Sequence, residues 1–179
     1  MKRLLLLTLI LFVPMQACVT LERSPITGKK RAYGYSWQEE IELGRDADKE
    51  ITAQYGIYDD PELTAYVDEM GQELVVVSHL ERDDTDPRFR DTKFVFRVLD
   101  SPVVNAFALP GGYVYVTRGL MGHLENEAQL AVVLGHEIGH VAARHASQRA
   151  AEQQLGQIAI IGGAVVGESF GLNAGSYWT

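Results

Sequence analysis

Apolar residues recur at intervals of three and four positions over long stretches of the chain, a spacing typical of amphipathic helices. The first two helices are predicted over residues 37–55 and 61–80. Asp60 is suited to cap the second helix, and Pro61 fits its first turn. Between residues 81 and 92, eight of twelve residues are charged, which indicates an exposed loop.

A third helical pattern follows Asn126, which with Gln129 makes a capping pair typical of a helix start. Two glycines interrupt the pattern, Gly135 and Gly139, and each costs about 1 kcal/mol relative to alanine inside a helix. They therefore indicate the close approach of another backbone or of a ligand. The apolar positions of this helix are Leu130, Val133, Leu134, Ile138 and Val141.

Phe94, Phe96 and Val98 alternate with Lys93, Val95 and Arg97, a pattern that predicts a half-buried strand. Two more strands are predicted over residues 103–109 and 113–117, joined through Pro110-Gly111-Gly112. Long helices beside a few short strands predict an α+β domain, mostly helical, with a small antiparallel or mixed sheet.

The segment His136-Glu137-Ile138-Gly139-His140 lies within the third helical pattern. Residues four apart share one face of a helix, so His136 and His140 can offer two imidazole nitrogens to one metal ion. Glu137 then stands beside the metal, where a general base can take a proton from the attacking water. The pattern predicts one Zn²⁺ per chain and hydrolytic chemistry. The alternative is a chance pair of histidines on a buried helical turn.

A catalytic zinc site needs a third protein ligand. His145 is five residues beyond His140, so on one continuous helix it is turned about 140° away and cannot complete the site. His79 and His123 are single histidines without a paired spacing. Glu168 lies beyond a glycine-rich stretch and is a weaker candidate.

Several further segments, in order from residue 24 to the end of the chain, resemble the HtpX- and Oma-type zinc metallopeptidases of family M48, in particular their periplasmic BepA-like lipoprotein branch. This resemblance is more specific than the zinc motif alone. The matching segments are Ser24-Pro25-Ile26-Thr27-Gly28, Glu39-Glu40-Ile41-Glu42-Leu43-Gly44-Arg45, Tyr55-Gly56, Asp59-Asp60-Pro61-Glu62-Leu63, residues 104–112, Thr117-Arg118-Gly119-Leu120, Asn126-Glu127-Ala128-Gln129-Leu130-Ala131, His140-Val141 and Arg144-His145.

The resemblance implies a zincin-like fold in which the sheet lies beside the zinc helix and its edge receives the substrate as an added antiparallel strand. Tyr113 and Tyr115 are the candidates for this edge, although ordinary core packing is the alternative for both. The resemblance also implies a third zinc ligand, a glutamate in an E-x-x-A-D element. The chain contains no such element, so the ligand is expected beyond Thr179, in a longer protein of which residues 37–179 form the N-terminal part of the peptidase domain.

The first residues have the pattern of a secretory signal, with Lys2 and Arg3 before an apolar run over 4–13. Met15-Gln16-Ala17-Cys18 is similar to a bacterial lipoprotein signal, which predicts a signal peptide over 1–17 and lipidation of Cys18. The alternative is a conventional signal with an incidental cysteine. Residues 18–36 are polar and partly basic, and they are interpreted as a tether to the domain.

Composition limits the function further. Cys18 is the only cysteine, which excludes an internal disulfide. The net charge of −8 gives no indication of nucleic-acid binding, because domains with that function carry basic patches. Residues 156–171 are glycine-rich and apolar, but they lack a phosphate-loop motif and are too short to span a bilayer. They predict a helix that is either buried or lies along a membrane surface.

The sequence therefore predicts a zinc metalloendopeptidase, lipid-anchored in the periplasm at the outer membrane. The resemblance implies misfolded envelope proteins as substrates and a link to the envelope assembly machinery. The alternatives are a chaperone-like module that binds unfolded strands without cutting them, and a zinc hydrolase that does not act on peptides.

Overall fold

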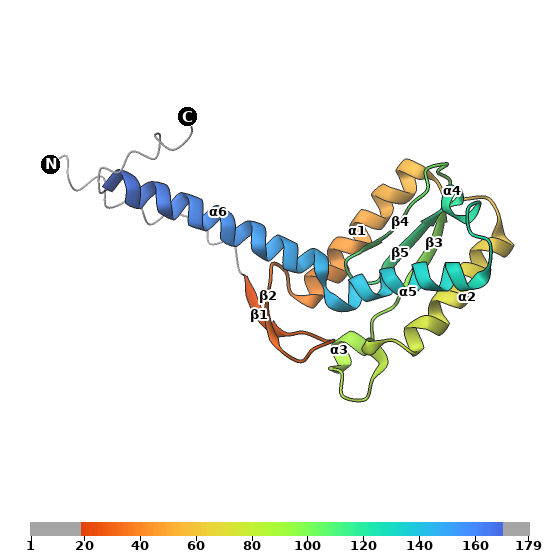
Figure 1. Cartoon of the computed structure of the whole chain (residues 1–179), viewed down its shortest axis with the longest axis horizontal. Coiled ribbons are helices and arrows are strands. Elements are labelled where there is room, and N and C mark those ends of the chain that lie inside the picture. The colour runs from red at the N-terminus through yellow and green to blue at the C-terminus, as the bar shows by residue number, and fades with distance from the viewer. Residues whose placement is uncertain (1–18, 170–179) are drawn as a thin grey trace.

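Helices surround a small β-sheet in the computed structural model, which describes residues 19–169 and the side chains of residues 19–158 (Figure 1). The elements, in chain order, are β1 (Thr20–Arg23), β2 (Lys30–Tyr33), α1 (Trp37–Tyr55), α2 (Pro61–Val76), the 3-10 turn η1 (His79–Glu81), α3 (Pro87–Arg90), β3 (Val95–Leu99), β4 (Ala106–Leu109), β5 (Tyr113–Thr117), α4 (Arg118–Met121), α5 (Glu127–Ala143) and α6 (His145–Ser169).

The sheet has the order β3-β5-β4, with β5 in the centre. Strand β3 is parallel to β5, whereas β4 is antiparallel to it, so the sheet is mixed. Helix α5 packs against β4 and β5, and α2 packs against β3 and α5. The predicted α+β fold, with a small mixed sheet beside the zinc-motif helix, is confirmed.

The two faces of the sheet differ in character because successive side chains on a strand point to opposite sides. Val98, Val114 and Val116 join α2 and α5 in the main core. On the other face, Nε and Nη2 of Arg97 donate to the Asp48 carboxylate of α1 at 2.8 and 2.9 Å, and the Tyr115 hydroxyl donates to the same carboxylate at 2.8 Å. This polar network fixes α1 on the sheet.

The predicted starts of α1 and α2 agree with the structure. Ser36 caps α1 in a reciprocal capping box with Glu39, and Asp60 caps α2 with Pro61 in its first turn. Helix α2 ends at Val76, four residues earlier than predicted, and the 3-10 turn follows. Strand β5 has the predicted bounds, and β4 begins three residues later than predicted, at Ala106.

The predicted tether is wrong for residues 20–33, which form the antiparallel hairpin β1–β2. The hairpin packs on α6: Gly34 N–H donates to the Ser147 carbonyl at 2.9 Å, and Arg31 donates to the Gln148 side chain at 3.0 Å. Contacts with a helix more than a hundred residues away therefore order a segment whose polar composition resembles a linker.

The charged segment 81–92 is more ordered than an exposed loop. It contains the short helix α3, and Phe89 of α3 is 3% exposed. The Phe89 ring meets Trp37 edge-on, with centroids 4.9 Å apart. One buried aromatic residue thus fixes an otherwise solvated segment to the start of α1.

Helix α6 extends away from the body of the molecule (Figure 1). Leu155 and Ile158, near the start of the glycine-rich apolar run, are about half exposed. The other side chains of that run lie outside the described residues. Among the helices that the structure describes, none combines the length and apolar character that crossing a bilayer requires.

Candidate metal centre

Helix α5 carries the zinc motif, and its position follows from its cap and its apolar face. The Asn126 side chain accepts a hydrogen bond from Gln129 N–H at 3.1 Å, as the capping pair predicted. Leu130, Leu134 and Ile138 are 0–3% exposed and face the core. Because these residues define the buried face, His136 and His140 lie toward the other side of the helix.

The two histidines converge. His136 Nε2 and His140 Nε2 are 3.1 Å apart, and their rings are perpendicular within 1°. Two nitrogens bound to one tetrahedral zinc at 2.0–2.1 Å are separated by about 3.3 Å. The pair therefore fits a zinc ion with little adjustment.

Glu137 follows His136 in the chain and is 8% exposed. It lines the same cleft as His140, a space of about 240 Å³ between α5 and β4. The β4 side of this cleft consists of Ala106, Phe107, Ala108, Leu109 and Pro110. A carboxylate, an imidazole and the backbone of a strand thus face a common space.

The pair has no third metal-binding partner in the part of the chain that the structure describes. His79 begins the 3-10 turn, and His123 contacts the Gly119 carbonyl at 2.7 Å near the other end of α5. The Glu168 side chain and Cys18 lie outside the described residues. The structure therefore brings together His136, Glu137 and His140 and leaves His79 and His123 apart from them.

The comparisons with known proteins agree with this geometry. The model of "Peptidase family M48" matches residues 61–176, which is more than half of the chain. The chain belongs to peptidase family M48. Its fold is accordingly that of a zincin-like metallopeptidase domain.

Curated relatives of this M48 chain include two kinds of protease. It is 34% identical to the mitochondrial metalloendopeptidase OMA1 of Schizosaccharomyces pombe over 73% of this chain and 37% of that protein. It is 32% identical to the beta-barrel assembly-enhancing proteases of Yersinia pestis and Escherichia coli, over 73% of this chain and 25% of each of those proteins. The match thus spans between 25% and 37% of the length of these relatives.

His145 of the M48 chain does not lie where a continuous helix would place it. Its Nδ1 atom is 2.6 Å from His140 Nδ1. The prediction that His145 is turned away from His140 is wrong because α5 ends at Ala143 and Arg144 adopts a left-handed conformation, with φ 57° and ψ 40°. His145 still does not join His136, because it contacts the opposite edge of the His140 ring.

Arg144 is the residue that sequence reasoning missed. Its side chain is fully buried, and its Nε donates to Glu40 at 2.7 Å, its Nη1 to Glu22 at 3.0 Å and its Nη2 to the Tyr35 carbonyl at 2.7 Å. The guanidinium also lies 3.8 Å from the centre of the Tyr33 ring. A sequence signal existed only in the Arg144-His145 match to the family.

Charge and burial affect two groups near the site. Burial lowers the pKa of His145, and the neighbouring His140 and Arg149 lower it further, so its neutral form is favoured. Burial raises the pKa of the Glu40 carboxyl, an effect that the charge and hydrogen bond of Arg144 oppose. Arg144 thus partly compensates for the burial of an acid at the end of the cleft.

The assignment of Tyr113 and Tyr115 to the substrate edge is wrong. Both belong to β5, which pairs with β3 on one side and β4 on the other, and Tyr115 is fully buried. Among the strands that the structure describes, the one at the edge of the sheet beside α5 is β4. The apolar pattern identified both strands, but it does not encode the order in which they pair.

Among the described residues, no second backbone lies close to Gly135 or Gly139: a Cβ atom at either position would meet nothing outside its own helix within 4 Å. The alternative, that a ligand approaches these glycines, stays a prediction. Close backbone approach occurs instead at Gly44 of α1, which lies against the Pro110 carbonyl. Gly44 thereby brings α1 against the turn that follows the edge strand β4.

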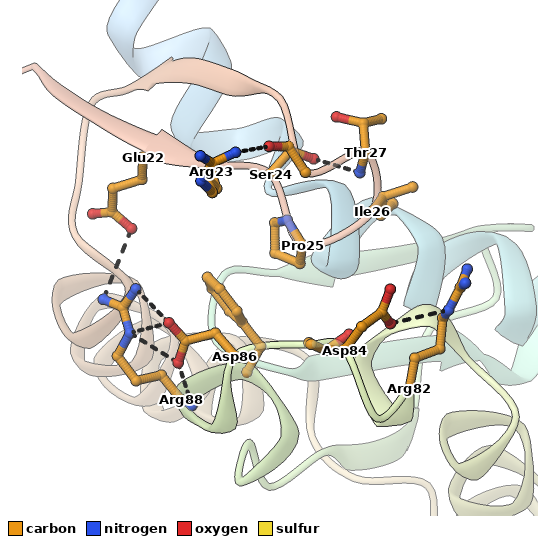
Figure 2. A pocket seen from close by; sticks show the side chains of 13 residues that line it. Glu22, Arg23, Ser24, Pro25, Ile26, Thr27, Arg82, Asp84, Asp86 and Arg88 are labelled. Carbon is orange, nitrogen blue, oxygen red and sulfur yellow. Dashed lines mark hydrogen bonds and ion pairs between the residues drawn. The ribbon is translucent and has the colours of Figure 1, made fainter.

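A second cleft, of about 430 Å³, lies between the β1–β2 turn and the segment before α3 (Figure 2). Its charged side chains bind one another, as in Arg88 with Asp86 at 3.0 Å and Arg82 with Asp84 at 3.4 Å. The two histidines of the metal centre are not among its lining residues. It therefore plays no part in the candidate centre.

Proposed function

We propose that the protein is a zinc-dependent endopeptidase that cuts extended segments of other proteins. One observation carries the proposal: the converging Nε2 atoms of His136 and His140 and the buried Glu137 lie beside a strand with a free edge. Membership of a peptidase family supports it.

The edge of β4 is suited to hold a peptide as an added strand. Asn105 and Thr117 form a hydrogen-bonded pair, in which Thr117 N–H donates to the Asn105 carbonyl at 3.1 Å. Hydrogen-bonded and non-bonded positions alternate in antiparallel strands. The main-chain groups of Phe107 therefore point toward β5, and those of Ala106 and Ala108 point outward, where a substrate backbone can pair with them.

The chain's own residues divide the work in this proposal. His136 and His140 hold the zinc through their Nε2 atoms, and the third ligand is a glutamate from outside the described residues. The bound zinc supplies a Lewis acid that polarises the scissile carbonyl and acidifies water. Glu137, largely buried in the wall of the cleft, takes the proton of the attacking water and delivers it to the leaving amine. The β4 edge aligns the peptide bond over these groups.

The cell envelope is the proposed place of action. The signal pattern ending at Cys18 supports export and a lipid anchor, with the periplasmic side of the outer membrane as the site. Misfolded envelope proteins are the proposed substrates. The similarity to beta-barrel assembly-enhancing proteases supports this context. The signal pattern ending at Cys18, which resembles that of bacterial lipoproteins, favours it over a mitochondrial one.

The test is Glu137→Gln in the full-length protein, with unfolded casein as substrate. Loss of the general base should lower kcat by about 10² to 10⁴ while zinc content stays the same. Glu152→Gln, an exposed change on α6, is the control and should cleave normally. Equal cleavage by Glu137→Gln and wild type would refute the mechanism. Wild-type binding of casein without any cleavage would support the chaperone-like alternative instead.

A further inference from the structure

His145 contacts His140, which is one of the two histidines of the proposed zinc site. The role inferred for His145 rests on that proposed site. His140 uses two different edges of its ring: Nε2 faces His136 at 3.1 Å, and Nδ1 faces His145 Nδ1 at 2.6 Å. The ring therefore stands between a metal position and a second histidine.

The protons on these rings can be assigned from this geometry. Two imidazole nitrogens 2.6 Å apart can share only one proton, so one donates and the other accepts. A metal ligand needs a free lone pair, which leaves the His140 proton on Nδ1 when Nε2 binds zinc. His145 Nδ1 must then accept this hydrogen bond, and the proton of His145 itself stays on Nε2.

We propose that His145 is a positioning residue that fixes the tautomer and orientation of the zinc ligand His140. Carboxylates and backbone carbonyls commonly fill this role for zinc-binding histidines. Here a second histidine takes it, five residues along the chain from the ligand that it holds.

The backbone explains how His145 reaches this position. A continuous helix would turn His145 about 140° away from His140. The left-handed conformation of Arg144 ends α5 and starts α6, and this break directs His145 back to the ring. Left-handed conformations are uncommon for residues other than glycine, and the buried contacts of the Arg144 side chain hold this one in place.

The proposal can be tested by zinc affinity. Metal-free full-length protein would be titrated with Zn²⁺ in competition with a chromophoric chelator. His145→Ala should weaken zinc binding by about 10- to 100-fold, the usual effect of losing such a partner. His145→Asn places an amide oxygen near the position of Nδ1, so it should restore most of the affinity.

His123→Ala is the matched control, because His123 Nδ1 also makes a hydrogen bond, which it donates to the Gly119 carbonyl, but the residue lies beyond the other end of α5. It should bind zinc as wild type does. The thermal midpoint of the metal-free protein should be the same for His145→Ala and His145→Asn, which separates positioning from a loss of folding.

Unchanged zinc affinity in His145→Ala would overturn the proposal. Equal weakening in His145→Asn and His145→Ala would also overturn it. If X-ray absorption then showed one nitrogen ligand fewer in the Asn variant, His145 would be a direct ligand. Failure of wild-type protein to bind zinc at all would instead reject the proposed function itself.

Discussion

Arg144 and Glu40 form an ion pair that is buried on both sides, with side chains 0% and 1% exposed and Nε 2.7 Å from Oε1. The pair joins the end of the zinc-motif helix to α1, more than one hundred residues earlier in the chain. Helix α1 also contacts the β4–β5 region that borders the cleft. One buried contact thus ties together the helix and the strand that flank the proposed site.

Removal of one partner of this pair should be costly. Glu40→Ala leaves the Arg144 cation without its most buried counter-ion, and breaking buried pairs in this way costs about 3–5 kcal/mol of unfolding free energy. Glu42→Ala, an exposed change on the same helix, should cost less than about 0.5 kcal/mol. Urea unfolding of both variants measures the difference. Similar values for the two would show that the pair does not stabilise the fold.

Acid should weaken the attachment of α1 to the sheet. Burial tends to raise the pKa of Asp48, but the hydrogen bonds from Arg97 and Tyr115 and the charge of Arg97 outweigh it, so its pKa lies below the ordinary value. The stabilisation by Asp48 is then complete above the pKa of the unfolded state and is lost as the pH falls through the folded pKa.

Asp48→Asn should accordingly be less stable than wild type at pH 7, and the gap should narrow as the pH falls below about 4. Urea midpoints between pH 3 and pH 7 measure this gap. Asp83→Asn, an exposed change, is the control and should differ little from wild type across the range. A gap for Asp48→Asn that stays constant with pH would contradict the expectation.

The β4 edge can be tested through its backbone. Ala108→Pro removes an N–H group that points away from β5, so the sheet should keep its pairing while a bound peptide loses one main-chain hydrogen bond. A loss of about 1 kcal/mol corresponds to a several-fold lower kcat/KM on an unfolded protein. Phe107→Pro removes an N–H that points toward β5, and it should lower stability as well. Normal cleavage by a stable Ala108→Pro protein would exclude this edge as the substrate strand.

The anchor can be tested by metabolic labelling with a fatty-acid analogue. Wild-type protein should carry the label, because Cys18 ends a lipoprotein-type signal. Cys18→Ala should be unlabelled, and it should be either soluble or unprocessed. A processed wild-type protein that stays in the membrane without label would show that the signal pattern was misinterpreted.

Local chemistry explains what the sequence could predict. Asn126 with Gln129 and Asp60 with Pro61 mark helix starts through groups only a few residues apart, and the bounds of α1 and β5 followed from short-range periodicity. The convergence of His136 and His140 is likewise a property of one helical turn. Each of these features needs no information from the rest of the chain.

The features that were missed depend on distant contacts. Arg144 has no local reason to be left-handed, and its conformation is held by Glu22, Glu40 and Tyr35. The central position of Tyr115 depends on strand order, and alternation along one strand does not determine that order. The β1–β2 hairpin is polar and buries few of its side chains. Its contacts with α6 order it, although its composition predicts a linker.

The Arg144 turn also has a consequence for the order of folding. Its three partners are 104, 109 and 122 residues earlier in the chain, so the turn forms only after very long loops have closed. Helix α5 needs no such closure, and its two histidines can lie on one face before Glu22, Tyr35 and Glu40 meet Arg144. The His140–His145 contact is therefore expected to form after helix α5, so the zinc motif can be helical before the contact that positions His140 exists.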